Sequence, residues 1–111
     1  MHSCGNLDAI TEDLIEDVKI DAKHSYEDVI LPVEIYHAKY GNRISVVGGI
    51  DVDSLCRKSE TEVRKRVREV LDTCMPTGGY VLGTGNSVAN YIPPANFLAM
   101  VDEGHAWRPG Y

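Results

Sequence analysis

Segments with helical and strand patterns alternate along the entire chain, and no tight-turn signal joins two strands directly. The order reads helix, strand, helix, strand, helix, strand, helix. Every connection between strands is long enough to contain a helix, so consecutive strands are expected to run parallel. A parallel sheet needs helices on its faces, and this alternation therefore predicts an α/β fold.

The individual elements follow from apolar patterns and capping residues. We expect strands at residues 18–22, 43–50 and 80–82, and helices at residues 8–17, 33–41, 60–75 and 95–103. Ser25 with Asp28 and Ser59 with Glu62 both fit the capping box that opens a helix. The first of these helices is expected to break at Pro32 and to restart at the next residue. Behind the second box, an apolar stripe predicts a buried helix face, formed by Val63, Val67, Val70, Leu71 and Cys74.

Three strands are few for a parallel sheet that stands alone. Residues 1–6 have the pattern of a strand's carboxyl end turning into a helix, with no strand before them. A natural domain rarely begins inside a turn. Residues 1–111 are therefore expected to form a single partial domain of a truncated or split chain.

Charge and composition exclude several classes of protein. The net charge is −6, which argues against a nucleic-acid partner, and the basic run from Arg64 to Arg68 alternates with glutamates as a solvated helix face does. No apolar run approaches the roughly 20 residues that span a bilayer, and no signal peptide is visible. We expect a cytoplasmic protein without nucleic-acid or membrane partners, whose cysteines stay reduced.

Polar side chains follow the expected strands, where α/β barrels place their reactive groups. His24, Asp51 and Thr84 each follow a short apolar segment, and we predict that they are catalytic. Asn86 and Ser87 lie in the glycine-rich turn after the last strand and are predicted to bind a cofactor. A tight turn without a ligand is an equally good interpretation of that segment. If the strands are parallel neighbours, all these residues open on one face.

A histidine and a cysteine two residues apart form a compact pair of nitrogen and sulfur ligands, which suits zinc. We predict that His2 and Cys4 bind metal, with an ordinary polar turn as the alternative. A zinc site needs further ligands, for which His24 is the better candidate and Cys56 the weaker one. Cys74 is expected at the opposite rim, because it ends a helix that runs antiparallel to the strands.

Three motifs together resemble the uroporphyrinogen decarboxylase superfamily and occur in its order. They are His2-Ser3-Cys4-Gly5-Asn6, Val47-Gly48-Gly49-Ile50-Asp51 and Tyr80-Val81-Leu82-Gly83-Thr84-Gly85-Asn86. The resemblance extends over residues 2–104 and implies the C-terminal half of a (β/α)₈ TIM barrel. The missing N-terminal half, or a second copy of the chain, would then be the partner that completes the barrel.

The superfamily has two branches, and the resemblance implies a different activity for each. One branch contains zinc-dependent methyltransferases that move a methyl group between a corrinoid on a partner protein and a thiol or methyl-ether substrate. Its His-x-Cys motif supplies two zinc ligands, at the positions of His2 and Cys4. The other branch decarboxylates uroporphyrinogen in porphyrin biosynthesis and has a histidine where this chain has Thr84.

The sequence favours the methyltransferase branch, because the metal-binding pair is present and the decarboxylase histidine is not. Thr84 departs from that branch as well, since members acting on coenzyme M have a cysteine there as third zinc ligand. A non-catalytic fragment, or a subunit of a split barrel, is the third interpretation.

Overall fold

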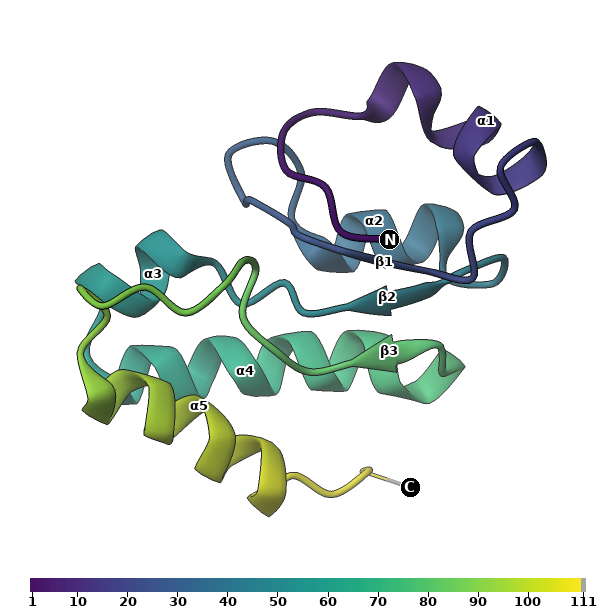
Figure 1. Cartoon of the computed structure of the whole chain (residues 1–111). Helices are drawn as coiled ribbons and strands as arrows, with labels where there is room; N and C mark the ends of the chain where they lie inside the picture. The colour runs from purple at the N-terminus through teal and green to yellow at the C-terminus, as the bar shows by residue number, and fades with distance from the viewer. Residues whose placement is uncertain (111) are drawn as a thin grey trace.

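The chain folds into a parallel sheet with helices packed against it, and a computed structural model describes residues 1–110 (Figure 1). The helices are α1 (Thr11–Glu16), α2 (Val33–Tyr40), α3 (Val52–Arg57), α4 (Glu60–Cys74) and α5 (Pro94–Ala106), and the strands are β1 (Ala22–His24), β2 (Ser45–Val47) and β3 (Tyr80–Val81). Short 3₁₀ helices precede α1 and follow α4, at Asp8–Ile10 and Met75–Thr77. None of the helices in residues 1–110 has the length and apolar character needed to cross a bilayer.

The strands lie in the order β1-β2-β3, and both neighbouring pairs are parallel. A helical connection joins β1 to β2 through α2, and another joins β2 to β3 through α3 and α4. The predicted α/β class, with parallel strands alternating with helices, is confirmed. The reason is that parallel neighbouring strands require a long crossover connection, which here contains helices.

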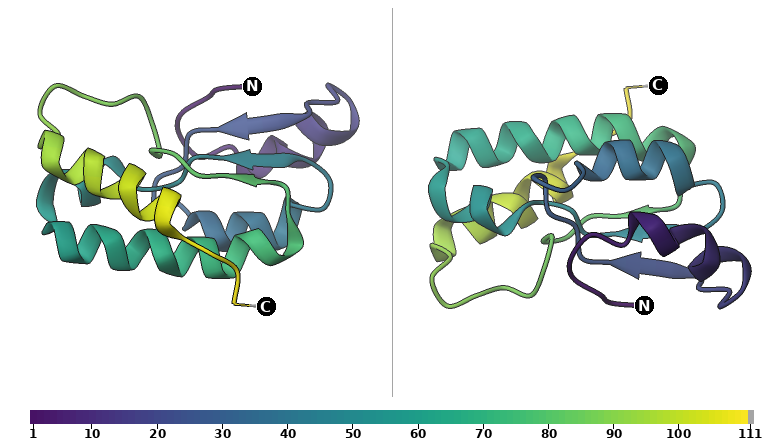
Figure 2. Two further views of the ribbon diagram at one scale, coloured as in Figure 1. Left: turned by 90° about the horizontal axis from the view of Figure 1, so that it is seen from below. Right: turned by 90° about the horizontal axis from the view of Figure 1, so that it is seen from above.

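One face of the sheet is covered and the other is open. Lys23, Val46 and Tyr80 stand in one row across the three strands and are buried. Lys23 lies near the Tyr36 ring and Tyr80 near the His37 ring, both on α2, and α2 and α4 lie on the same side of the sheet (Figure 2). The residue that follows each of the three buried strand residues points to the opposite face and is at least partly exposed, with 54% exposure for Val81. The apolar core therefore lies between the sheet and its helices.

Helix α4 begins and packs as the sequence predicts. Ser59 Oγ accepts a hydrogen bond from the Glu62 N–H at 3.2 Å, and the Glu62 carboxylate accepts one from the Ser59 N–H at 3.5 Å. All residues of the predicted apolar stripe are buried. The capping box and the stripe are both confirmed, and together they fix where this helix starts and which face it buries.

The segment before α2 differs from the prediction. The first strand begins at Ala22 instead of residue 18, because Lys19 turns the chain with a φ of 62°. No helix starts at Ser25, whose own φ is 91°. The N–H of Asp28 donates instead to the Asp51 carboxylate at 2.7 Å. The N–H group that the capping-box motif assigns to the Ser25 side chain is therefore bound by the distant Asp51 carboxylate.

The prediction also misses one helix and misplaces the end of another. Helix α3 has no counterpart in the prediction, and Asp51 caps its start by accepting a hydrogen bond from the Asp53 N–H. Helix α5 continues through Gly104 to Ala106, although a glycine there was expected to end it. A Cβ on Gly104 would collide with the Leu82 side chain. The glycine serves close packing of α5 on the chain after β3.

The basic run on α4 is only partly solvated, contrary to the prediction. The Arg66 side chain is 14% exposed and makes two hydrogen bonds of 2.8 Å with the Glu34 carboxylate on α2. Arg64 and Arg68 both bond to Glu103, a buried residue of α5. These arginines tie α4 to its two neighbouring helices.

Candidate functional site

The sequence-predicted strand ends meet at one edge of the sheet. His2 forms a parallel bridge with His24 at the end of β1, and Ile50 forms one with Thr84 beyond β2 and β3. His2, His24, Thr84 and the residue after Ile50, Asp51, therefore lie at the carboxyl ends of parallel strands. This convergence was expected from the alternation of helices and strands alone.

The His24 side chain spans the end of the sheet. Its Nε2 lies 3.0 Å from the carbonyl oxygen of Thr84, in the loop that follows β3. The ring passes over Gly48, where a Cβ would come within 2.9 Å of the His24 ring and would collide with the Thr84 carbonyl. Gly48 also has a φ of 92°, which favours glycine. The glycine after β2 is thus needed for His24 to reach its partner.

These contacts fix the tautomers of two histidines. A carbonyl oxygen only accepts, so His24 carries a proton on Nε2, and its Nδ1 accepts when the imidazole is neutral. The Nδ1 atoms of His24 and His2 lie 2.7 Å apart. His2 therefore donates from Nδ1, and its Nε2 carries the free lone pair. That lone pair lies 3.7 Å from the Sγ atom of Cys4.

Cys4 is exposed and has a second polar neighbour. The Asn86 side chain donates a hydrogen bond from Nδ2 to the Cys4 sulfur, at 3.2 Å. Asn86 follows β3 and was predicted to bind a cofactor; it reaches the cysteine across the end of the sheet. An amide N–H is a suitable partner for the negative charge of a thiolate. The cluster of His2, Cys4, His24 and Asn86 is hereafter the strand-end cluster.

The other cysteines lie apart from this cluster. Cys74 is buried at the end of α4, close in sequence to the start of β3, and so lies at the opposite rim, as predicted. Burial raises the pKa of the Cys74 thiol to about 11. Cys56 lies in α3 and packs against the core. Within residues 1–110, Cys4 is the exposed thiol.

Asp51 has a clear structural role. Its two carboxylate oxygens accept hydrogen bonds from the backbone N–H groups of Asp28 and Asp53, at 2.7 and 2.8 Å. The side chain thereby caps α3 and holds the loop after β1 against the loop after β2. A catalytic role for Asp51 stays a prediction.

Thr84 and Ser87 also make local contacts. The Thr84 hydroxyl donates to the backbone oxygen of Asn86, and its own carbonyl accepts from His24. Ser87 is exposed, and its N–H donates to the Asn86 side chain at 2.8 Å. Thr84 therefore shapes the loop that carries Asn86. Catalysis by Thr84 and cofactor binding by Ser87 stay predictions.

An open groove runs beside the strand-end cluster. It has a volume of about 760 Å³ and is lined by the loop after β1, the start of α3 and the loop after β3. Asp51, Asn86 and Ser87 all face it. A groove of this size is large enough for a small-molecule substrate.

The strand-end cluster fits two zinc ligands. Zinc bonds of about 2.3 Å to sulfur and about 2.0 Å to nitrogen place two tetrahedral ligands roughly 3.5 Å apart. The separation of 3.7 Å between His2 Nε2 and Cys4 Sγ matches this value. His24 uses both ring nitrogens in hydrogen bonds, so it orients His2 instead of serving as a ligand. Residues 1–110 hold no group of three or more His, Cys, Asp and Glu side chains placed to bind a metal ion.

A parallel sheet with polar side chains converging at its strand ends is the arrangement of the active-site end of α/β barrels. The chain belongs to the uroporphyrinogen decarboxylase family, since the family model Uroporphyrinogen decarboxylase (URO-D) matches residues 1–107. The resemblance carried by the three sequence motifs is thereby confirmed.

Individual relatives agree with this assignment. The chain is 36% identical over 66 residues to the uroporphyrinogen decarboxylase of Cupriavidus metallidurans, a match that covers 57% of this chain and 18% of that protein. It is 33% identical over 69 residues to the one of Bordetella petrii, covering 60% of this chain and 19% of that protein. The chain thus spans about a fifth of the length of these relatives.

A solved structure has the same fold. A methyltransferase from Methanosarcina mazei superposes with a TM-score of 0.74, and the match covers 95% of this chain and 30% of that one. The two sequences are 24% identical, so this likeness concerns the fold. It supports the prediction that the chain forms part of a larger barrel.

Proposed function

We propose that this chain contributes the strand-end part of the active site of a zinc-dependent methyltransferase. The observation that carries the proposal is the His2–Cys4 pair, in which a free imidazole lone pair lies 3.7 Å from an exposed thiol. When bound there, zinc supplies Lewis-acid chemistry that activates a thiol or methyl-ether substrate. A corrinoid on a partner protein is the proposed methyl carrier.

The neighbouring residues position this pair in the proposed site. His24 accepts a hydrogen bond from Nδ1–H of His2 and thereby keeps Nε2 of His2 unprotonated and aimed at the metal position. Such outer contacts typically change metal affinity by 10- to 100-fold when removed. Asn86 donates to the cysteine sulfur and lines the groove, which is the proposed substrate channel.

Uroporphyrinogen decarboxylation is the second candidate function. It is favoured by the relatives at 33–36% identity, which are uroporphyrinogen decarboxylases. This reaction requires no metal, only groups that orient the tetrapyrrole and move protons. His24 and His2 would then form a proton-conducting pair at the end of the sheet. For either function we expect the protein in the cytoplasm.

Metal analysis of matched cysteine variants tests the first proposal. The protein is purified as it assembles in solution, with zinc supplied, as wild type, Cys4→Ser and Cys56→Ser. We expect bound zinc in the wild type and in Cys56→Ser, and its loss in Cys4→Ser, because among the cysteines of residues 1–110 it is Cys4 whose sulfur contacts a histidine nitrogen. Equal zinc content in both variants would contradict a thiolate site at Cys4. Absence of zinc from all three would favour the decarboxylase, or a non-catalytic fragment if activity is absent too.

We further propose that the remainder of the barrel covers the open face of the sheet. The chain accounts for 18% of a relative's length and 30% of the matching methyltransferase, so most of a barrel lies outside these residues. Val81 is 54% exposed on this face, and within residues 1–110 no further strand pairs with the outer edge of β3. When the N-terminal half of a relative's barrel is added, we expect a soluble complex of the two chains, detected by sedimentation. A sharply unfolding monomer near 12 kDa, unchanged by that addition, would contradict the proposal; a stable dimer would assign the face to a second copy.

A further inference from the structure

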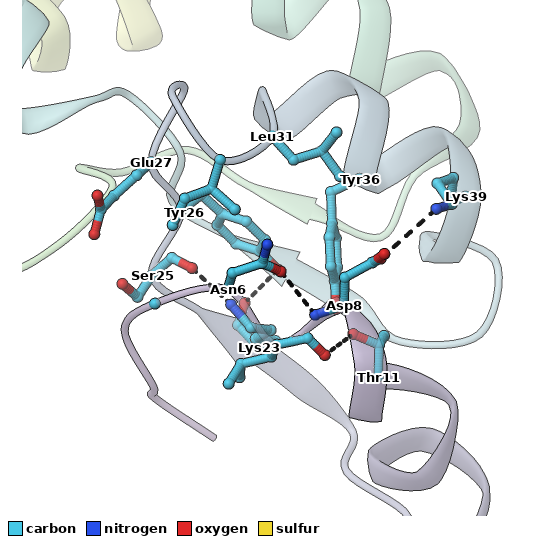
Figure 3. A pocket seen from close by; sticks show the side chains of 13 residues that line it. Asn6, Asp8, Thr11, Lys23, Ser25, Tyr26, Glu27, Leu31, Tyr36 and Lys39 are labelled. Carbon is cyan, nitrogen blue, oxygen red and sulfur yellow. Dashed lines mark hydrogen bonds and ion pairs between the residues drawn. The ribbon is translucent and has the colours of Figure 1, made fainter.

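A second cavity lies away from the strand-end cluster, on the covered side of β1 (Figure 3). It has a volume of about 170 Å³, opens to solvent on one side, and is lined by the loop before α1, the β1 strand, the loop after it and the helix α2. Its lining includes none of the four residues of the strand-end cluster. We call it the Lys23 cavity, after the one strand residue that faces it.

Lys23 is a buried amino group that forms no ion pair within residues 1–110, and burial lowers the pKa of its ammonium form. Its side chain is 4% exposed, and Nζ donates one hydrogen bond, to the Ser25 carbonyl at 2.6 Å. The aromatic rings of Tyr26 and Tyr36 lie 4.3 and 5.6 Å from Nζ. No ion pair found in residues 1–110 includes Lys23. An ammonium has three N–H donors, and one of those of Lys23 is used by Ser25. The other N–H groups of Lys23 are available to a ligand in the cavity.

Tyr36 supplies a second unused donor to the same cavity. Its side chain is buried, and its hydroxyl makes no hydrogen bond of normal geometry. Burial raises the pKa of Tyr36, and a contact with the nearby Thr11 hydroxyl offsets part of this effect. The Thr11 hydroxyl, which also lines the cavity, donates to the Leu7 carbonyl. A buried hydroxyl without a partner is unfavourable, and such groups mark places where a ligand or water completes the structure.

The charges at the cavity mouth do not neutralise Lys23. Asp8 lies 3.9 Å from Lys39, so these two side chains form an ion pair at the mouth. The Glu27 carboxylate points away from the cavity (Figure 3). No acidic side chain of residues 1–110 therefore balances the charge of Lys23. Ile30 and Leu31 give the same cavity apolar walls.

We propose that the Lys23 cavity binds a small aliphatic carboxylate, held by the Lys23 ammonium and the Tyr36 hydroxyl. A carboxylate only accepts hydrogen bonds, and its two oxygens match donors that come from two different elements. The volume corresponds to about five or six water molecules at roughly 30 Å³ each, which limits the ligand to about four to six heavy atoms. A short alkyl chain would contact the apolar walls. The proposal does not rest on the proposed metal or methyl-transfer chemistry.

Titrations with acetate, butyrate and acetamide test this proposal on the whole chain, in the assembly that it forms in solution. Binding is followed by chemical-shift changes or thermal stabilisation. We expect saturable binding of acetate and butyrate in the millimolar range, since four heavy atoms give limited affinity. Acetamide has the shape of acetate without its charge and should bind at least about 10-fold more weakly.

Two tyrosine variants provide the matched comparison. Tyr36→Phe removes a hydroxyl that makes no hydrogen bond of normal geometry, so the fold should be retained, and acetate binding should weaken about 5- to 10-fold. Tyr40→Phe changes a buried tyrosine of the same helix that does not line the cavity, and should bind as the wild type does. Lys23→Met should abolish binding. Equal affinity for acetate and acetamide, equal affinity in the two tyrosine variants, or no saturable binding would each overturn the proposal.

Discussion

The two faces of the sheet contrast most sharply at neighbouring valines of one strand. Val46 and Val47 have the same side chain, yet Val46 is completely buried under the helices and Val47 is partly exposed on the open face. Tyr80 and Val81 repeat this contrast on the next strand. Such strands are apolar on both faces in parallel sheets that are covered on both sides. The open face therefore has apolar side chains like those of a barrel interior, but it lacks the contacts that the opposite strands of a closed barrel would make.

The two reactive side chains of β1, Lys23 and His24, also lie on opposite faces of the sheet. Lys23 points into the covered layer and His24 toward the open face, one residue apart. Successive side chains of a strand leave on opposite faces, so one short strand serves two separate sites. In the proposed barrel the strand-end cluster would face the remaining strands, whereas residues 1–110 already line the Lys23 cavity.

Acidic substitutions at the paired valines should give the largest effect. Val46→Asp places a carboxylate without a partner in the core, and we expect a loss of more than about 3 kcal/mol in the free energy of unfolding, enough to unfold the chain. Val47→Asp should cost under about 1 kcal/mol in the chain alone, because water reaches this face. Urea titrations followed by circular dichroism measure both.

The difference between the two valine variants should nearly disappear when the barrel is completed. In a complex with the N-terminal half of a relative's barrel, Val47→Asp should become nearly as damaging as Val46→Asp. If the two variants are equally destabilised in the chain alone, the assignment of an open face is wrong.

A partly buried ion pair in the covered layer gives the next largest effect. Arg66 is 14% exposed and bonds to Glu34 through two nitrogens, whereas Arg57 and Asp53 are 78% and 69% exposed. Arg66→Met leaves the Glu34 carboxylate without its partner and should cost about 2–4 kcal/mol. Arg57→Met should change stability by less than about 0.5 kcal/mol. Similar losses of unfolding free energy in both variants would show that water reaches the Arg66–Glu34 pair as freely as it reaches the exposed pair.

The same pair predicts how stability depends on acid. Hydrogen bonds from Arg66 hold the pKa of the Glu34 carboxyl below its ordinary value of 4.5. A carboxyl with a lowered pKa in the folded state stabilises the protein fully above the ordinary value, and this contribution is lost as the pH falls through the lower folded-state value. Glu34→Gln should therefore flatten the stability curve below about pH 4.5. The neighbouring Asp28 acts in the opposite direction, because burial raises its pKa.

Sequence reasoning succeeded where a local pattern and the tertiary contacts agree. The stripe of α4 and the grouping of His2, His24 and Thr84 at the strand ends follow from periodicity and from strand direction. It failed where a distant residue decides the local structure, as with the Asp51 carboxylate that caps α3 and binds the loop after β1. Nor does the sequence reveal that Lys23 is buried, since a lysine next to a strand end is usually solvated.

The smallest effect distinguishes two serines that begin similar sequence motifs. Ser59 accepts a hydrogen bond from Glu62 N–H and caps α4, the long helix of the covered layer. Ser59→Ala should therefore cost about 1 kcal/mol. Ser25 opens no helix, and its φ of 91° is strained for any residue with a Cβ. Ser25→Gly should leave stability unchanged or raise it by about 0.5–1 kcal/mol, because glycine adopts this conformation without strain. Urea midpoints of the two variants decide the matter: equal losses would mean that Ser25 contributes a cap, which the contacts of Asp28 contradict.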